Sequence, residues 1–432
     1  MEKVSSKKLL NIVTLCILLI VPFLKFFSMN LEYFDVLKNY DSVNPAIVLY
    51  VSVPFLMFIY IEDIIRKKRK LDIYDYLFYI LIITGIISTI FSIDKNLSIF
   101  GKDLRHEGFL SMLSYYLLFI NWKIYGTKED IKKYIKLLVI IGVINSIYSL
   151  LQIYTPFNFI IRYAKDVSMA SGMCGNPNFF GSLIVTVMSI VMCNFLMNKK
   201  IDKKEIITII LLFIALINSQ STGPFLTFVI TILFLIFFLK NKNYLIIKKL
   251  IILIIILLVT YASIYFVNKI GYKSERCEMC DIKETVNTGG NGRLRIWKNS
   301  LDIVKDYPIV GVGFDNFYLA YPNPDIKDAI TYVITNGVMK PKVNYILIYD
   351  NAHNVYLHTL VSTGILGLIP FLLLCLFTFI RGLRFKNKLG ILLLSGFVAY
   401  SIQAFANISV VQVAPIYYLI IGLILSIKEE PN

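Results

Sequence analysis

Long runs of hydrophobic residues alternate with short polar links along most of the chain. A helix that crosses a membrane needs about 20 consecutive, mostly apolar residues. Runs of this kind predict twelve helices, at residues 9–28, 45–61, 72–92, 108–124, 132–153, 177–197, 205–219, 222–240, 245–267, 355–380, 389–406 and 409–427. We therefore expect an all-α integral membrane protein with about twelve transmembrane helices.

One long polar segment interrupts this pattern and divides the chain into three parts. We expect an N-terminal transmembrane bundle of about nine spans at 1–267, a large external loop at 268–354, and about three C-terminal spans at 355–432. Within the loop, residues 291–306 have an amphipathic pattern and predict a short helix, with Asn291 as its cap and Pro308 as its stop. Gly311 and Gly313 indicate a turn. Residues 321–352 show no clear period, so we expect them to be irregular.

Composition and charge agree with a membrane protein and indicate its orientation. The chain has 432 residues, of which 57% are hydrophobic and 17% charged, and its mean hydropathy is +0.69. A net charge of +16 can indicate nucleic-acid binding in a soluble protein. Here, however, the basic residues gather in every second link, as the positive-inside rule describes, whereas residues 269–352 carry 11 Lys and Arg against 10 Asp and Glu. We expect a multi-pass protein of the cytoplasmic (cell) membrane, with both termini cytoplasmic and no nucleic-acid partner.

Neither a metal site nor an ion-coupled transport site is indicated. Cys277 and Cys280 form a single Cys-x-x-Cys in the loop, and one such pair does not complete a four-ligand zinc site. A local disulfide or two free thiols remain open for this pair. No Asp or Glu lies in the middle of a predicted span, where ion-driven carriers usually place ionisable groups. We expect no metal and no cofactor.

His353 is the first candidate for chemistry, because it lies where the external loop meets a span. An imidazole at this place can accept a proton from a sugar hydroxyl near neutral pH. The alternative is an interfacial or helix-capping histidine. His358 lies about one turn deeper and can support His353, but packing is its simpler role.

Arginines on the external face are the next candidates. Arg293 and Arg295 can each match two phosphate oxygens of a diphosphate and remain charged, and the alternative is ordinary headgroup or carboxylate pairing. Arg105 belongs to a second external cluster with His106 and Glu107, for which a structural Arg105–Glu107 ion pair is the simpler interpretation. In a third external segment Asn176 is a plausible helix cap, with Pro177 as the first helical residue.

An ordered set of motifs resembles the O-antigen ligase/polymerase superfamily, which carries the Wzy C-terminal domain. It consists of Gly292-Arg293-x-x-Ile296-Trp297, Pro308-Ile309-x-Gly311-x-Gly313-x-Asp315-Asn316-Phe317, Ala352-His353-Asn354-x-Tyr356-Leu357 and Thr363-Gly364-Ile365-Leu366-Gly367. The strong match covers about 290–370, and Gly175-Asn176-Pro177-Asn178 extends it loosely toward the rest of the chain.

The resemblance implies a metal-independent membrane glycosyltransferase. Its donor would be an undecaprenyl-diphosphate-linked oligosaccharide, and its acceptor a glycan, lipid or protein. By position, His353 would activate or orient the acceptor hydroxyl and Arg293 would hold the diphosphate. We expect Arg105, Arg295, Trp297, Asn354 and Asn176 to contact the substrate.

One position departs from the family pattern. Many members have a second essential arginine in a Ser-Arg-Gly-like segment, where this chain has Ser221-Thr222-Gly223. Arg105, Arg162 or Arg295 would then supply the missing charge, or the diphosphate would be bound differently.

The function that follows is the polymerisation or ligation of lipid-linked glycan on the external face of the membrane. Polymerase and ligase differ only in the acceptor, and we mildly favour polymerisation or export of a surface polysaccharide. The alternative from another class is a flippase or transporter of lipid-linked saccharides, for which symmetric halves and a charged central cavity would be expected. A third possibility is a non-catalytic assembly partner, in which the external His and Arg residues would be dispensable.

Overall fold

The computed structural model describes residues 2–33, 45–67, 69–102, 105–154, 169–239, 244–271, 293–321, 330–335, 338–343 and 349–428. Its α-helices in these ranges are α1 Glu2–Tyr33, α2 Ile47–Lys67, α3 Ile73–Ile90, α4 Lys95–Phe100, α5 Phe109–Tyr125, α6 Lys128–Tyr154, α7 Pro177–Met197, α8 Lys203–Asn218, α9 Thr222–Leu239, α10 Tyr244–Gly271, α12 Arg293–Asp306, α13 Phe317–Ala320, α14 Val355–Leu383, α15 Lys388–Gln403 and α16 Ala414–Ser426. Two short 3₁₀ helices lie at Gly172–Cys174 and Ala404–Ala406, and two strands are β1 Ile330–Thr335 and β2 Val338–Val343.

Each of the twelve expected spans overlaps one of these helices. Within the described residues, eight helices are long and apolar enough to cross a membrane: α2, α3, α6, α7, α9, α10, α14 and α15. The helical fold class and a multi-pass membrane protein are therefore confirmed at this level. The helix expected at 291–306 is also present, as α12, and its expected cap Asn291 lies outside the described residues.

Two expectations were wrong. Residues 330–335 and 338–343 form an antiparallel pair and are not irregular; Ile330 pairs with Val343, and Thr335 with Val338. Ile, Thr, Tyr and Val in the first strand favour extended backbone even though polar and apolar residues do not alternate. The last span begins at Ala414 and not at residue 409. Pro415 disfavours helical backbone before it, and Asn407 turns away to bond the backbone carbonyl of Asn178.

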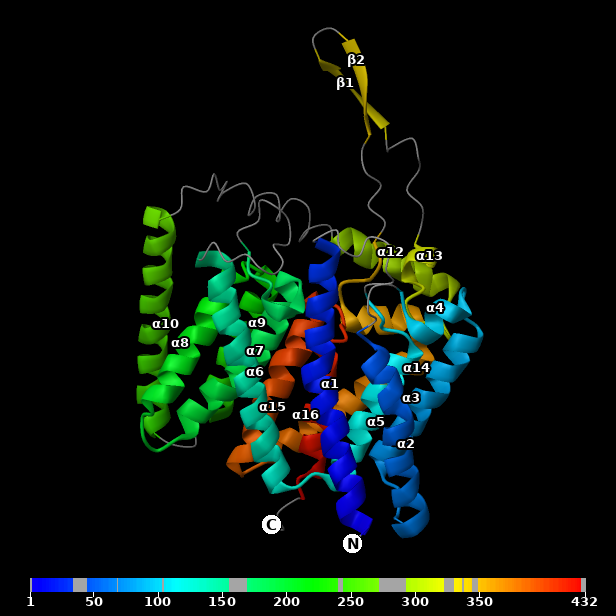
Figure 1. Cartoon of the computed structure of the whole chain (residues 1–432), viewed down its shortest axis with the longest axis horizontal. Coiled ribbons are helices and arrows are strands. Elements are labelled where there is room, and N and C mark those ends of the chain that lie inside the picture. Colours follow the sequence, from blue (N-terminus) through cyan, green and yellow to red (C-terminus); the bar gives the residue numbers. More distant parts are fainter. Residues whose placement is uncertain are drawn as a thin grey trace.

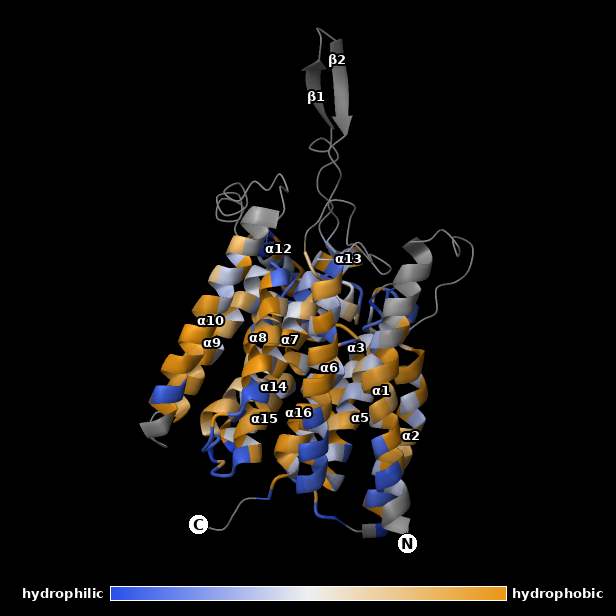
Figure 2. Ribbon diagram, turned by 60° about the vertical axis from the view of Figure 1, so that its left-hand side comes forward, coloured by the Kyte–Doolittle hydropathy of each residue, from blue (hydrophilic) through white to orange (hydrophobic). Residues whose placement is uncertain are grey.

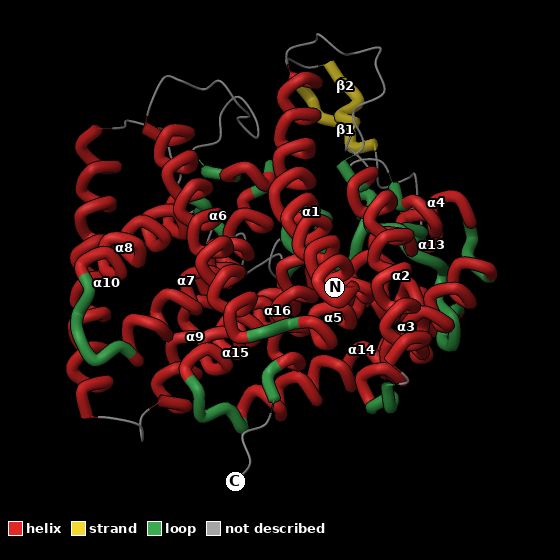
Figure 3. The backbone as a smooth tube through the Cα atoms, turned by 60° about the horizontal axis from the view of Figure 1, so that its bottom comes forward, coloured by secondary structure: helices red, strands yellow, loops and turns green. Residues whose placement is uncertain are grey.

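The bundle has α8–α10 on one side and α2–α4 on the other, with α5, α7, α15 and α16 between them (Figures 1 and 3). Helix α16 packs on α5 and α15 packs on α7, so the C-terminal helices lie among the N-terminal ones. Almost every residue of α7 is buried. Hydrophobic residues cover the middle of the bundle, whereas hydrophilic residues gather toward its two ends (Figure 2).

Both ends of the chain lie at the same end of the bundle (Figure 1). Lys7 of α1 forms an ion pair with Asp130 of α6 at 2.7 Å, and the turn at Gly126 approaches Ser426 at the end of α16. Helices α4, α12 and α13 lie at the opposite end (Figure 1). A chain that crosses the bundle an even number of times has both of its ends on the same side.

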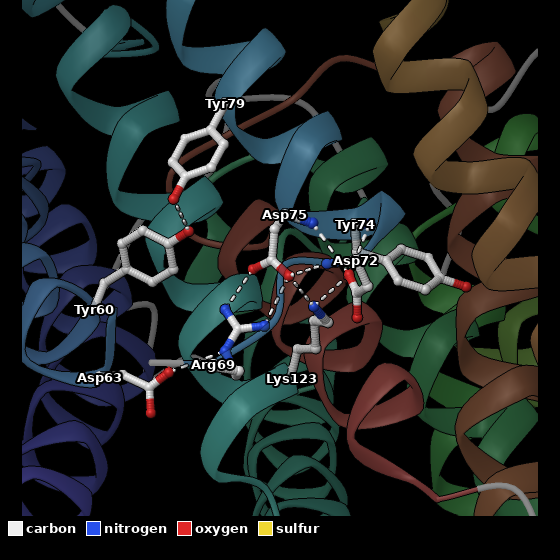
Figure 4. A network of polar contacts seen from close by, with 8 residues as sticks. All are labelled: Tyr60, Asp63, Arg69, Asp72, Tyr74, Asp75, Tyr79 and Lys123. Carbon is white, nitrogen blue, oxygen red and sulfur yellow. Dashed lines mark hydrogen bonds and ion pairs between the residues drawn. The ribbon is translucent and has the colours of Figure 1, made fainter. Parts of the chain in front are cut away.

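Part of the basic link between α2 and α3 is held by ion pairs (Figure 4). Arg69 donates two hydrogen bonds to the carboxylate of Asp75, at 2.6 and 2.8 Å, and one to Asp63 at 3.0 Å. Lys123 of α5 bridges Asp72 and Asp75, at 2.6 and 2.8 Å. Asp72 also caps α3 through a reciprocal capping box with Asp75. These charges fix the ends of α2, α3 and α5 relative to one another.

The feature that brings the polar segment before α14 to the bundle is a break in α14. Gly364 has φ 62° and ψ −166°, which interrupts the helix. Residues 308–313 insert at the break: Val312 N–H and Gly313 N–H donate to the carbonyls of Val361 and Ser362, both at 2.9 Å. On the other side of the break, Ile365 N–H and Leu366 N–H donate to the carbonyls of Pro308 and Ile309, at 2.9 and 3.3 Å. Irregular backbone is tolerated at membrane depth only where such groups are paired.

Candidate active site

Helix α12 is docked on the first turns of α14 by a small core of its own. Its buried residues are Ile296, Ile303, Val312, Phe317, Tyr321, Ala352 and Val361. The indole N–H of Trp297 donates to the carbonyl of Ala352 at 3.0 Å, which ties α12 directly to the residue before His353. The core and this hydrogen bond together place the start of α12, with Arg293, beside the start of α14.

His353 is held in an uncommon backbone conformation. Its φ is 51°, in the left-handed region that non-glycine residues seldom adopt. The side chain of Asn351 accepts the backbone N–H of His353 at 3.1 Å. Asn354 then caps α14 by accepting the N–H of Leu357 at 3.0 Å. Backbone strain of this kind persists where surrounding contacts fix it and is common at functional sites.

The charges of three side chains act on His353. Burial, and then the positive charge of Arg293, lower the pKa of His353 below its ordinary value of 6.5; Asp350 acts in the opposite direction, and Arg105 adds to the lowering. Burial also lowers the pKa of Arg293, which leaves the guanidinium charged because the pKa of a free arginine is above 12. The imidazole is therefore neutral at pH 7 and can accept a proton.

Arg105 comes to this place from a distant part of the sequence. Its Nε donates to the carboxylate of Asp350 at 2.7 Å, across 245 residues of chain. The guanidinium also lies 5.6 Å from the ring centroid of Phe179, in the first turn of α7. The expected ion pair between Arg105 and Glu107 was wrong, because Glu107 turns into the bundle, where the hydroxyl of Tyr115 donates to it at 2.8 Å.

Asp315 fixes the segment that carries Arg105. Its Oδ2 accepts two backbone N–H groups, from Lys102 at 2.9 Å and from Glu107 at 3.0 Å. Next to it, the side chain of Asn316 accepts the N–H of Asp94 at 2.7 Å and donates to the carbonyl of the same residue at 3.1 Å. Asp315 and Asn316, which follow the inserted residues 308–313, therefore hold the backbone at Asp94, Lys102 and Glu107, on both sides of Arg105.

Two carboxyl groups beside Arg105 have raised pKa values. Burial raises the pKa of Asp315 to about 6, although two N–H groups donate to it. Burial raises the pKa of Glu107 to about 7, with the charge of Asp315 adding to the effect and hydroxyls of Ser409 and Tyr115 opposing it. Although burial acts to raise it, the Arg105 guanidinium holds the pKa of the Asp350 carboxyl below its usual value. The site thus contains one firmly ionised carboxylate and two that titrate near neutral pH.

The remaining predicted residues lie around this centre. Arg295 is exposed on α12, and its charge acts on the hydroxyl of Tyr321 and not on His353. Asn176 caps α7 by accepting the N–H of Asn178 at 2.8 Å, and Pro177 is the first helical residue, as expected. His358 is half-buried, with its ring 5.9 Å from that of Phe317. Arg162 and the Cys277–Cys280 pair lie outside the described residues.

Sequence reasoning did not find Asp315, Asp350 or Asn351 as parts of the site. Asp315 is inside the motif that carries the resemblance, and Asp350 and Asn351 directly precede Ala352-His353-Asn354. A search of the residues flanking each motif for carboxylates and amides would have found all three. In the described part of the chain, no three His, Cys, Asp or Glu side chains gather as a metal site.

The fold and this site define a multi-pass helical membrane protein whose polar loop brings arginines and a neutral histidine to one end of the bundle. Residues 207–372 match the model of the O-antigen ligase family, Wzy_C, a family of glycosyltransferase-type enzymes. The match includes Arg293, Trp297 and His353, whereas Arg105 and Asn176 lie before it. No curated protein matches the chain.

Proposed function

We propose that this protein transfers a glycan from a polyprenyl diphosphate, of the undecaprenyl type, to a hydroxyl group of an acceptor. The observation that carries the proposal is that the charges of two arginines, Arg293 and Arg105, both act on His353. Arg293 and His353 lie within the region matched by the O-antigen ligase family model, and Arg105 lies before it. Arginines suit a diphosphate because each guanidinium can donate two parallel hydrogen bonds to phosphate oxygens.

In this mechanism the acceptor hydroxyl oxygen attacks the anomeric carbon of the donor sugar. A new carbon–oxygen bond forms as the bond to the diphosphate oxygen breaks, and His353 accepts the hydroxyl proton. Arg293 and Arg105 bind the diphosphate and stabilise the charge that develops on it as it leaves. The chemistry assigned to these residues requires no metal ion, because the guanidinium groups supply the positive charge.

Arg105 is the second diphosphate-binding arginine in this proposal, in place of the arginine that Thr222 replaces. Of the three alternatives, Arg105 acts on His353, whereas Arg295 is exposed near Tyr321. Asp350 supports this role by fixing Arg105 through its Nε, which leaves the other guanidinium nitrogens to bind phosphate. Trp297, Asn354 and Asn176 hold the surrounding helix ends, and we propose that the glycan passes beside them.

The proposed arrangement in the membrane has twelve spans with both termini cytoplasmic. The bundle of 1–267 and the helices of 355–432 would frame an external catalytic loop at 268–354. This orientation is supported by the basic links at the end where α1 begins and by the position of α12 at the opposite end (Figures 1 and 2). A donor displayed outside the membrane would then meet His353 at the headgroup level.

The test compares wild type with His353→Ala and Arg293→Ala in cells and in membrane vesicles. We expect both variants to insert at wild-type levels, to lose more than about 99% of transfer, and to accumulate lipid-linked glycan on the external face, since removing groups that act in the transition state commonly costs 10²-fold or more. Lys298→Ala is the matched control, because Lys298 is an exposed cation of α12 outside the site. Arg105→Ala should lose much more activity than Arg295→Ala.

The outcomes separate this proposal from its alternatives. Accumulation of the lipid-linked glycan only on the cytoplasmic face would identify a flippase instead. Full activity of His353→Ala would show that the histidine only shapes the start of α14. Polymer that shortens without loss of a conjugate would favour a polymerase, and loss of the conjugate alone would favour a ligase.

A further inference from the structure

A small cavity with both polar and apolar lining residues lies beside the start of α14, among α7, α15 and residues 407–413. Its lining includes Ser182, Val355, Tyr400, Gln403 and Asn407. It measures about 240 Å³ when its open mouth is counted, but its closed part has room only for a group about the size of a water molecule. Because Val355 lies two residues after His353, the cavity adjoins the candidate active site and does not overlap the arginines.

The side chain of Gln403 has a hydrogen-bonding group that the protein does not use. Gln403 is 1% exposed, and its Oε1 accepts the hydroxyl of Thr227 at 2.6 Å. Its buried Nε2 has no hydrogen-bond partner and lies near Gly223 of α9, while Gln403 itself is one of the residues that line the cavity. If the amide were turned over, Thr227 would accept from Nε2 and the oxygen would be the unpaired atom. In either orientation one polar atom of this amide lacks a partner.

The other polar lining residues are held in place. The side-chain nitrogen of Asn407 donates to the carbonyl of Asn178 at 3.1 Å and to the hydroxyl of Ser182. Ser182 in turn donates to the carbonyl of Asn178 at 2.9 Å. No residue that lines the cavity is charged. The lining therefore suits a neutral hydroxyl group and would not compensate the charge of a phosphate.

We propose that this cavity is a sugar subsite, in which Gln403 binds one hydroxyl or hydroxymethyl group of a glycan. The proposal rests on the proposed transfer function for the identity of the ligand. It assigns two parts of the substrate to different places. The diphosphate lies against the arginines, and an uncharged sugar ring lies beside the start of α14 with one hydroxyl in the cavity. The hydroxyl can belong to the donor glycan or to the acceptor, since both present the same chemistry.

Direct binding tests the subsite without requiring catalysis. The full-length protein in nanodiscs is studied by saturation-transfer-difference NMR with D-glucose, D-galactose and N-acetyl-D-glucosamine as probes. We expect a saturation-transfer signal from at least one sugar with the wild-type protein. This signal should be lost in Gln403→Met, whose side chain has a similar length but no hydrogen-bonding group. Gln403→Glu, which keeps an acceptor for Thr227, is the second variant if Gln403→Met does not fold. The absence of a saturation-transfer signal with wild type, or equal signals with wild type and the Gln403 variants, overturns the proposal of a sugar subsite.

Two controls separate the subsite from general damage and from the catalytic proposal. Ser395→Ala removes a buried hydroxyl of α15 that bonds only its own helix, to the carbonyl of Leu392 at 2.7 Å, and should bind sugar as wild type does. Arg293→Ala and His353→Ala should also retain sugar binding. If wild type binds sugar yet transfers no glycan, the proposed function fails and the subsite stands.

Kinetics then identify which glycan enters the cavity. Initial transfer rates are measured against donor concentration at saturating acceptor, and against acceptor concentration at saturating donor. We expect Gln403→Met to raise one of the two KM values about 5- to 10-fold, the usual effect of one lost hydrogen bond, while inhibition by inorganic diphosphate is unchanged. A raised donor KM assigns the cavity to the donor glycan, and a raised acceptor KM assigns it to the acceptor. Two unchanged KM values overturn the proposal.

Discussion

Replacement of Gly364 by alanine is the sharpest test of how residues 308–313 are held against α14. Gly364 lies at the break in α14 with φ 62°, where a side chain is strained. A Cβ atom added there would lie 2.1 Å from the carbonyl oxygen of Ile309 and 2.2 Å from its carbon. Because both are backbone atoms, no side-chain rotation can relieve the contact. The inserted segment at 308–313 would have to move.

The cost can be worked from these contacts. Left-handed backbone costs alanine about 1–2 kcal/mol relative to glycine. Displacing the inserted segment removes its four backbone hydrogen bonds to α14, those of Val312, Gly313, Ile365 and Leu366. Each contributes about 0.5–1.5 kcal/mol, and more where the freed groups cannot reach water. The expected destabilisation is roughly 3–8 kcal/mol, which is a large share of the 5–15 kcal/mol typical of a folded domain.

Thermal unfolding with a thiol-reactive dye measures this effect, because Cys174 and Cys193 are free and buried in the folded protein. We expect Gly364→Ala to lower Tm by roughly 5–10 °C or to prevent accumulation of the protein. The matched control is Gly223→Ala. Gly223 is helical, and an added Cβ there would have no neighbour closer than 3.5 Å, so this change should be neutral or slightly stabilising. If the two variants unfold at the same temperature, the inserted segment does not depend on Gly364.

Three further predictions concern charge. Asp315→Asn keeps an acceptor for the N–H groups of Lys102 and Glu107 and tolerates the φ of 51°, so we expect a near wild-type rate of glycan transfer. Asp315→Ala removes the acceptor and should lower this rate about 10-fold or more. Equal rates for the two variants would refute this role of Asp315. Since the folded pKa of Asp315, about 6, exceeds 3.8, wild type should also lose stability as pH rises between these values. Asp315→Asn should lose less over the same range, the rest coming from Glu107, as Tm against pH will show. His353 must be neutral to accept a proton, so kcat/KM should fall only at a pH below 6.5. Because the charge of Arg293 lowers the pKa of His353, Arg293→Gln should move this fall to higher pH. If the pH profile of the residual activity does not move, the charge of Arg293 does not act on His353.

Hydrophobic patterning predicted the helices well, because apolar length is what a membrane requires of a span. It failed where backbone pairing, and not periodicity, decides the structure. The break at Gly364 lies inside a predicted span of mostly apolar residues, and the insertion of 308–313 pairs the backbone groups on both sides of it. Gly311 was expected to mark a turn, but its φ of 70° and the contact of an added Cβ with the backbone of Ser362 show that it permits close approach to α14.

The candidate site was predictable in its principal members but not in its pairing. Arg293 and His353 could be chosen because both lie on the external loop and carry the chemistry that a diphosphate and a hydroxyl require. The partner of Arg105 could not be chosen, since Glu107 is two residues away and Asp350 is 245 residues away. Proximity in sequence favoured the wrong carboxylate. The two hydrogen bonds of Asp315 to the Arg105 segment, across 213 and 208 residues, were equally out of reach.

The insertion also constrains how the site can move during a catalytic cycle. If residues 308–313 left α14, four backbone groups on each side of the break would lose their partners at a depth where lipid offers none, at a cost of several kcal/mol. Asp315 follows this segment directly and holds the backbone on both sides of Arg105. Arg105 is therefore anchored to the bundle through the inserted segment. Under the proposed function, the donor would enter and the diphosphate would leave with this part of the site in place. The positive charge proposed to bind the diphosphate would then be preorganised before the substrate arrives.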